Sequence, residues 1–320
     1  MDLKDALGHS SKTLRVTIVK EKAIYEEPWF YALCSLTGLV ILGFVIHKYV
    51  QRKLKALEQK HREEAELERV NNDLQMAKRI QASMLPHVFP PFPDRNEFEI
   101  YASMDPAKAV GGDFYDFFFT DKDHLCLVMA DVSGKGIPAA MFMMNSKVML
   151  QNIAGTCKSP AEILKKGNDT LCSNEDSEMF VTVWLGILDL KTGKIVAANA
   201  GHEYPSVRHS DGGYELYTDK HGLVLGGMEG VSYKEYEIEL KPGDSLFLYT
   251  DGVPEATNSS EEMFGTDRML EALNSDPDAA PDQILANVRK AVDEFVKDYE
   301  QFDDLTMMCI RYDGSPKKKK

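Results

Sequence analysis

The stretch VMADVSGKGIPAAMFM (128–143) sets an aspartate, Asp131, at the end of an apolar run and directly before a glycine-containing loop. Three other stretches also place aspartates beside apolar runs: AVGGDFYD (109–116), LYTDGVPEATN (248–258) and FDDLTMM (302–308). Four such loops could aim carboxylates at one point. Hard divalent cations such as Mg²⁺ and Mn²⁺ prefer oxygen ligands, and a site for two cations needs several charged ones. The sequence therefore predicts a metal centre built at strand ends.

The acidic charge of the chain is concentrated after residue 80. The 320 residues carry a formal net charge of −14, and residues 81–316 hold 19 basic and 40 acidic side chains. So acidic a body repels nucleic-acid phosphates, which excludes nucleic acid as a partner. The five cysteines are scattered without a CxxC pair. This pattern indicates a reducing compartment and argues against both a disulfide framework and a structural zinc.

An uncharged run from Trp29 to Ile46, WFYALCSLTGLVILGFVI, is long enough to cross a bilayer. As a helix it spans about 27 Å. Basic residues follow its C-terminal end, so we expect a single-pass inner-membrane helix with the catalytic part in the cytoplasm and residues 1–28 as a short extracytoplasmic segment. A signal peptide and a buried helix are the alternatives. A signal peptide is disfavoured because 28 mixed-charge residues precede the run and no small-residue cleavage pattern follows.

Residues 47–85 are charged and helix-favouring, and no Gly or Pro interrupts them before Pro86. Apolar and neutral positions recur there at spacings of three and four: Leu67, Val70, Leu74, Ala77, Gln81 and Met84. The spacing predicts a short coiled-coil seam that could pair two copies of the chain, with a single solvated linker helix as the alternative. Four prolines between 86 and 93 then mark a boundary. We expect a catalytic domain over 94–313 and a basic tail over 314–320.

Within this domain, strand-like and helical segments do not alternate one for one. The expected strands are 98–103, 125–130, 180–188, 194–200, 233–240, 245–249 and 305–311, and the expected helices are 138–154, 160–172, 266–273 and 281–299. Helices that follow strand hairpins favour antiparallel sheets covered by helices over a doubly wound sheet. The fold class is therefore α+β.

The ordered motifs resemble those of SpoIIE-like bacterial phosphatases, which are metal-dependent serine/threonine phosphatases of the PPM class. The resemblance rests on the four stretches quoted above together with IQASMLP (80–86), NAGHEYP (199–205) and KPGDS (241–245), and it covers roughly residues 75–312. It implies a PPM-type α-β-β-α sandwich with two Mn²⁺ or Mg²⁺ ions at one edge of the central sheets.

The same resemblance implies a set of ligands. Carried over by position, the set is Asp113, Asp131, the Val132 carbonyl, Asp251 and Asp303. Asp131 would bridge both cations and act with Asp251 in catalysis, whereas Asp113 would serve one cation directly or through water. Asp304 competes with Asp303 for its role.

Two residues of the wider family pattern have no obvious counterpart. Eukaryotic members carry a His just after the bridging Asp-Gly and an upstream phosphate-binding Arg, but here Val132-Ser133 follows Asp131 and no Arg is obvious before Asp113. Lys135 could attract the phosphate, or it could be a solvated loop lysine. His202 could be the acid, or it could be a structural turn histidine.

The resemblance implies a phosphatase that hydrolyses phosphoserine or phosphothreonine through a water bridging two cations, and the apolar run from Trp29 to Ile46 implies that this phosphatase is tethered to a membrane. Its implied substrate is a phosphorylated anti-sigma-factor antagonist in a partner-switching pathway. A catalytically silent signalling module that binds the same partner is one alternative, and a metal-dependent nucleotide hydrolase is another. GGDF (111–114) is not a diguanylate cyclase signature because Phe114 replaces its Glu, and GLVLGG (222–227) lacks the strand–turn–helix context of a nucleotide loop.

Overall fold

The computed structural model describes residues 16–173, 178–210 and 212–314 of the chain, which divides into two compact units, 1–70 and 71–320. The first unit contains the short 3-10 helix η1 (Ile24–Glu26) and most of the helix α1 (Pro28–Met84). The predicted membrane helix and the predicted linker are therefore parts of one uninterrupted helix. Residues 315–320 of the basic tail and more than half of the N-terminal segment lie outside the described residues.

The N-terminal part of α1 is apolar, and its side chains are not buried. It is long and apolar enough to cross a membrane, and none of this span is buried inside the protein. The buried-helix alternative for residues 29–46 is therefore wrong, whereas a signal sequence near the N-terminus would meet the same criteria of length and composition.

Two five-stranded antiparallel sheets form the second unit. Sheet one has the order β1 (Phe98–Asp105), β10 (Leu305–Tyr312), β9 (Ser245–Tyr249), β6 (Ser206–Arg208) and β7 (Tyr214–Leu216). Sheet two has the order β2 (Phe114–Phe119), β3 (His124–Val132), β4 (Val181–Asp189), β5 (Lys194–Ala200) and β8 (Glu235–Glu239). The predicted α+β class is confirmed.

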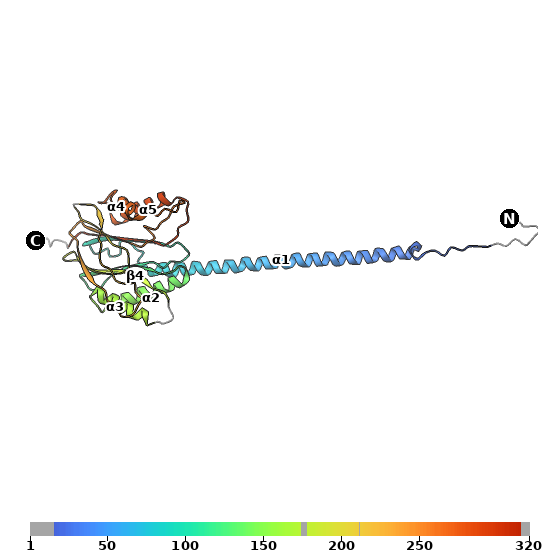
Figure 1. Cartoon of the computed structure of the whole chain (residues 1–320), viewed down its shortest axis with the longest axis horizontal. Helices are drawn as coiled ribbons and strands as arrows, with labels where there is room; N and C mark the ends of the chain where they lie inside the picture. The colour runs from blue at the N-terminus through green and yellow to red at the C-terminus, as the bar shows by residue number, and fades with distance from the viewer. Residues whose placement is uncertain (1–15, 174–177, 211, 315–320) are drawn as a thin grey trace, which may run out of the picture. The chain divides into compact units, whose positions relative to one another are not determined.

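Helices cover the outer faces of both sheets. α2 (Ile137–Ala154) and α3 (Pro160–Cys172) pack on sheet two, and α4 (Gly265–Leu273) and α5 (Pro281–Val296) pack on sheet one, on the opposite side of the unit in Figure 1. One core cluster includes the side chains of sheet two and its helices, with Trp184 fully buried, and a second lies between sheet one and α4–α5. These layers form the α-β-β-α sandwich that the resemblance implied.

Three strands were not predicted, and the most consequential is β2. Its sequence FYDFFF is buried at its first four positions, so it shows no alternation of polar and apolar residues. One of those positions is Asp116, whose carboxylate lies 2.7 Å from the Lys147 ammonium of α2 in a buried ion pair. The other two missed strands, β6 and β7, have only three residues each.

Candidate metal centre

Strand register brings the predicted carboxylates to one edge of the two sheets. In sheet two, the first residue of β2 pairs with Ala130 of β3, so Asp113 and Asp131 lie at the same end. In sheet one, β9 ends and the antiparallel β10 begins at a common edge, which places Asp251 near residues 303–304. The two motifs near the start of the domain and the two near its end therefore lie close together in the fold.

Asp113 joins the two sheets at this edge. Its side chain is almost fully buried, with 1% exposure, and its Oδ2 accepts hydrogen bonds from Thr250 Oγ1 at 2.7 Å and Thr306 Oγ1 at 2.5 Å. The two threonines are themselves linked, because Thr250 N donates to Thr306 O at 3.1 Å. A carboxylate of sheet two is therefore fixed by hydroxyls of sheet one, which aligns the two halves of the site.

The carboxylates at this edge carry unbalanced negative charge. Burial raises the pKa of Asp131 to about 6, with repulsion from Asp303 and Asp304 adding to the rise and a hydrogen bond with Asp113 opposing it. Burial, followed by repulsion from Asp131, raises the pKa of Asp251 to about 7. The pKa of Asp113 is also well above its ordinary value, chiefly through burial. A bound divalent cation would offset this repulsion.

The oxygen atoms available at this edge are of the chemical type that hard divalent cations bind. Carboxylate and carbonyl oxygens are the ligands that Mg²⁺ prefers and that Mn²⁺ accepts. Over residues 16–173, 178–210 and 212–314, however, no three His, Cys, Asp or Glu side chains are grouped closely enough to hold one ion as they stand. The carboxylates would therefore have to turn towards a cation to bind it.

Asp304 is committed to the backbone of the glycine loop. Its carboxylate accepts hydrogen bonds from the backbone N–H groups of Ala107 at 2.8 Å, Gly112 at 2.7 Å and Asp113 at 3.3 Å. A Cβ on Gly111 would lie 2.1 Å from the same carboxylate, so the loop can approach only because that position is glycine. Asp304 thus shapes the loop that presents Asp113.

Asp303 has different surroundings. Its Oδ2 lies 2.9 Å from the ammonium of Lys135, which also donates to the Phe302 carbonyl at 2.6 Å. Lys135 is therefore neither fully solvated nor free, because it ties the loop after β3 to the segment before β10. The geometry favours Asp303 over Asp304 as the cation ligand, and this assignment remains a proposal.

His202 is a structural link beneath the site. Its ring is 4% exposed, its Nε2 donates to the Tyr249 carbonyl at 3.1 Å, and its Nδ1 lies 2.8 Å from Thr182 Oγ1. Because a carbonyl only accepts, the neutral ring carries its proton on Nε2 and accepts at Nδ1. Burial lowers the pKa of His202 to about 3. It therefore joins β4 to β9 and is not placed to donate a proton to a leaving group.

Sequence reasoning missed the part that Gln81 plays in this site. Gln81 was placed in a coiled-coil seam, but its side chain is 4% exposed and brackets Gly111 of the glycine loop. Its Nε2 donates to Gly111 O at 2.7 Å, and its Oε1 accepts from Gly111 N at 3.1 Å. A glutamine among apolar seam positions was the available signal, because a buried amide needs partners on both of its atoms.

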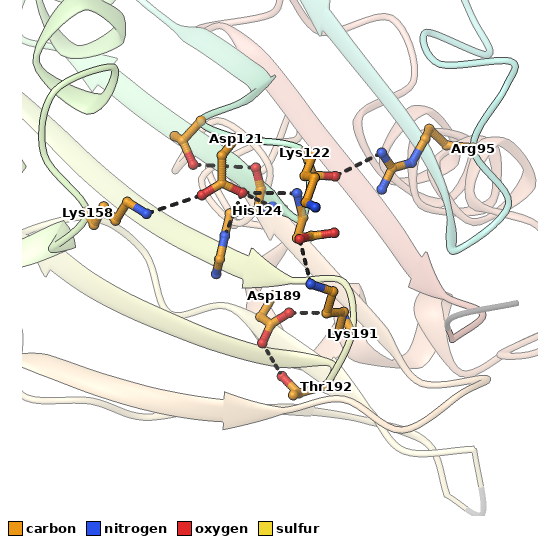
Figure 2. Close-up of polar contacts among 10 residues, drawn as sticks. Arg95, Asp121, Lys122, His124, Lys158, Asp189, Lys191 and Thr192 are labelled. Carbon is orange, nitrogen blue, oxygen red and sulfur yellow. Dashed lines mark hydrogen bonds and ion pairs between the residues drawn. The ribbon is translucent and has the colours of Figure 1, made fainter.

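A second polar cluster lies at the opposite end of β3. Figure 2 shows Asp121 between His124 and Lys158, with His124 Nδ1 at 2.8 Å and Lys158 Nζ at 3.4 Å from its carboxylate oxygens. The backbone N–H of Asp123 and the His124 ring lower the pKa of Asp121. Because these groups satisfy one another at a turn, the cluster shapes the β2–β3 connection and is separate from the metal edge.

Comparison with protein families identifies the class. The family model described as stage II sporulation protein E (SpoIIE) matches residues 121–313, more than half of the chain. The chain therefore belongs to the SpoIIE family, whose catalytic domain is of the PP2C phosphatase type.

Two curated relatives give the range of similarity. The chain is 26% identical over 286 residues to phosphoserine phosphatase RsbU of Bacillus subtilis, covering 89% of this chain and 80% of that protein. It is 29% identical over 265 residues to protein IcfG of Synechocystis sp., covering 74% of this chain but only 41% of IcfG.

Solved structures show the same fold. The SiaA-PP2C domain of Pseudomonas aeruginosa superposes with a TM-score of 0.67 at 22% identity, covering 77% of this chain and 98% of that one. The PP2C phosphatase domain of SpoIIE from Bacillus subtilis, solved with a fragment of its regulatory domain, gives 0.57 at 19% identity, covering 68% and 63%.

Proposed function

We propose that this chain is a membrane-tethered, metal-dependent phosphatase that removes phosphate from phosphoserine or phosphothreonine in a protein. The observation that carries the proposal is the convergence of Asp113, Asp131, Asp251 and Asp303 from four strand ends at one edge of a SpoIIE-family sandwich. Similarity to a protein named phosphoserine phosphatase supports the substrate class. From the resemblance to SpoIIE-like phosphatases, we propose a phosphorylated anti-sigma-factor antagonist as the substrate.

Each residue of the site has a part in this reaction. Two divalent cations, Mn²⁺ or Mg²⁺, held by the four carboxylates and the Val132 carbonyl, would supply Lewis acidity and activate water for attack on phosphorus. The chain's own groups position those ligands. Thr250 and Thr306 fix Asp113, whereas Asp304 and Gln81 hold the loop before it.

The catalytically silent alternative is less well supported. Each of the four carboxylates lies at the shared edge, and burial with like-charge repulsion raises the pKa of three of them. A silent module would keep this unfavourable charge without using it, whereas a metal site requires it.

The membrane tether is proposed for the apolar part of α1. The span is accessible, long and apolar enough to cross a bilayer, and the basic residues that follow it favour a cytoplasmic catalytic unit in the inner membrane. A homodimer through α1 is proposed as well. Leu67 and Val70 are 71% and 50% exposed, and so are available to a partner helix.

The function is tested by phosphate release from the full-length protein in detergent with Mn²⁺. We expect release from a phosphoserine protein, its loss on addition of a chelator, and much slower release from ATP. Preferred hydrolysis of ATP would favour the nucleotide hydrolase. No Mn²⁺-dependent release from any phosphoprotein, with intact binding of one, would favour the silent module.

A further inference from the structure

A cavity opens directly beside the edge of the two sheets where the proposed metal ligands Asp251 and Asp303 lie. It has a volume of about 170 Å³ and lies between α5, the loop after β9 and the segment that leads into β10. Gly252, which follows Asp251, and Asp303 both line it. A molecule in this cavity would therefore lie next to whatever phosphate the carboxylate edge holds.

The floor of the cavity is apolar. Val292 and Leu305, which are 4% and 3% exposed, line it together with Ala256 and Val296. Phe302 at its margin is 70% exposed, although it adjoins a charged edge. The Lys135 ammonium lies 3.6 Å from the centre of that ring and holds it at the margin. Polar and charged side chains surround this apolar floor, so the cavity offers a small apolar contact within a polar rim.

The outer wall is held in place before any ligand binds. Gln301 Nε2 donates to the backbone carbonyls of Asp105 and Asp303, both at 2.8 Å. Arg289 of α5 pairs with the Asp105 carboxylate. The chain leaves α5 through Lys297, whose φ of 56° and ψ of −121° are unfavourable for a residue with a side chain. Such strain is kept where a shaped wall matters, and a preformed wall lowers the entropy cost of binding.

The charges at the rim narrow the choice of occupant. Glu255 and Glu300 line the cavity, and within the described part of the chain no ion pair joins either of them to a basic side chain. Arg289 is engaged by Asp105 and Asp293, which leaves Lys297 as the opposing charge. A net negative rim disfavours a nucleotide, whose additional phosphates would be repelled.

We propose that this cavity is a recognition subsite for an apolar side chain of the phosphoprotein substrate, close in sequence to the phosphorylated serine or threonine. The proposal rests on the proposed phosphatase function and adds a specificity determinant to it. An extended segment advances about 3.3–3.6 Å per residue, so a side chain one to three positions away from the phosphate reaches the cavity. Burial of that side chain on Val292, Val296 and Leu305 would select the substrate.

The test compares synthetic peptides that carry one phosphoserine, with a leucine at each of the three positions on either side in turn, against an all-glycine parent. The enzyme is the full-length chain in detergent with Mn²⁺. At one or more positions leucine should lower the KM about tenfold, the range for one apolar group in a pocket. Val296→Trp fills the cavity and should abolish this preference. Lys290→Trp adds the same ring to the exposed face of α5 and should retain it.

A second variant tests the same subsite in case Val296→Trp misfolds. Phe302→Ala alters an exposed ring and should also reduce the leucine preference while leaving the fold intact. Equal KM values for all peptides with the wild type, or a preference that survives both variants, would overturn the subsite alone. A wild type that releases no phosphate from any peptide or phosphoprotein would overturn the proposed function itself. Faster release from ATP that Val296→Trp removes would assign the cavity to a nucleotide base and overturn the proposal.

Discussion

Asp303 and Asp304 are neighbours in the sequence, but their side chains have different contacts and therefore different roles. Asp304 accepts three backbone hydrogen bonds from the glycine loop, whereas Asp303 faces Lys135. Sequence alone left the choice between them open, because both directly precede the same strand, β10, and only the direction of each side chain separates them. The fold directs the Asp304 carboxylate to the backbone of the glycine loop and the Asp303 carboxylate to Lys135.

This difference predicts separate phenotypes for the two asparagine variants. Asp304→Asn removes a charged acceptor from buried N–H groups and should lower the free energy of unfolding by about 1–3 kcal/mol. Asp303→Asn should lower Mn²⁺-dependent turnover with a change in stability below about 1 kcal/mol. Urea unfolding of residues 71–320, followed by fluorescence of Trp184, their single tryptophan, measures the stabilities. The reverse pattern would exchange the two roles.

The raised pKa values of Asp131 and Asp251 predict an unusual pH dependence for the metal-free protein. In the folded state the two groups titrate at about 6 and about 7, above their ordinary value of 3.8. Between about pH 4 and pH 7 the folded state therefore binds more protons than the unfolded state, so their contribution to stability falls as pH rises. Mn²⁺ should stabilise the protein more at pH 7.5 than at pH 5, as thermal melts with and without chelator would show.

Burial also raises the pKa values of Asp113, Asp116 and Glu203, so the control is the Asp131→Asn/Asp251→Asn double variant. Relative to wild type, its metal-free stability should improve as pH rises from 5 to 7.5. Parallel pH profiles for the two proteins would show that the fold does not raise the pKa values of these two carboxylates.

At the scale of elements, periodicity predicted those parts that have one buried face or a clear boundary. Helix 160–172 was predicted to the residue, and strand 194–200 likewise. β2 was missed because it is buried on both faces and contains a charge, Asp116, that only its partner Lys147 on α2 makes tolerable. No local pattern reveals a partner that lies 31 residues away.

The seam of α1 shows the same limit within one helix. Its last members turn to the catalytic unit: Leu74, Ala77 and Met84 are partly buried, and Gln81 is fully so. Leu67 and Val70 remain exposed. The spacing placed these residues on one face of the helix. It could not show that the C-terminal part of this face packs on the catalytic unit whereas the N-terminal part stays exposed.

Gln81→Ala should uncouple the end of α1 from the loop that carries Asp113, because it removes both hydrogen bonds between Gln81 and Gly111. The change leaves the N–H and C=O of Gly111 buried without their partners, at a cost of about 1–3 kcal/mol. The loop that carries Asp113 should loosen, so the Mn²⁺ concentration for half-maximal activity should rise. Gln75→Ala, at an exposed position of the same helix, is the matched control. Identical Mn²⁺ dependence in the two variants would show that the end of α1 does not influence cation binding.

At the scale of the whole molecule, the chain joins an apolar helix to an acidic catalytic unit. The apolar span of α1 is accessible throughout. In water such a surface would aggregate or seek a bilayer, in which a helix satisfies all of its backbone hydrogen bonds internally.

The intact chain should therefore sediment with membranes, resist a carbonate wash and need detergent for release. Deletion of residues 29–46 should move it to the soluble fraction with its phosphatase activity retained. Recovery of the intact chain from the soluble fraction without detergent would contradict the tether.

In the proposed function, carboxylates from four strand ends form one metal-dependent hydrolytic site. Its most direct test is calorimetric titration of Mn²⁺ into wild type, Asp131→Asn and Asp251→Asn, with phosphate release measured on the same samples. We predict that both variants lose Mn²⁺ affinity and turnover together, since each removes a ligand charge, and that both keep the wild-type fold. Wild-type Mn²⁺ binding and turnover in both variants would show that Asp131 and Asp251 do not hold the cations.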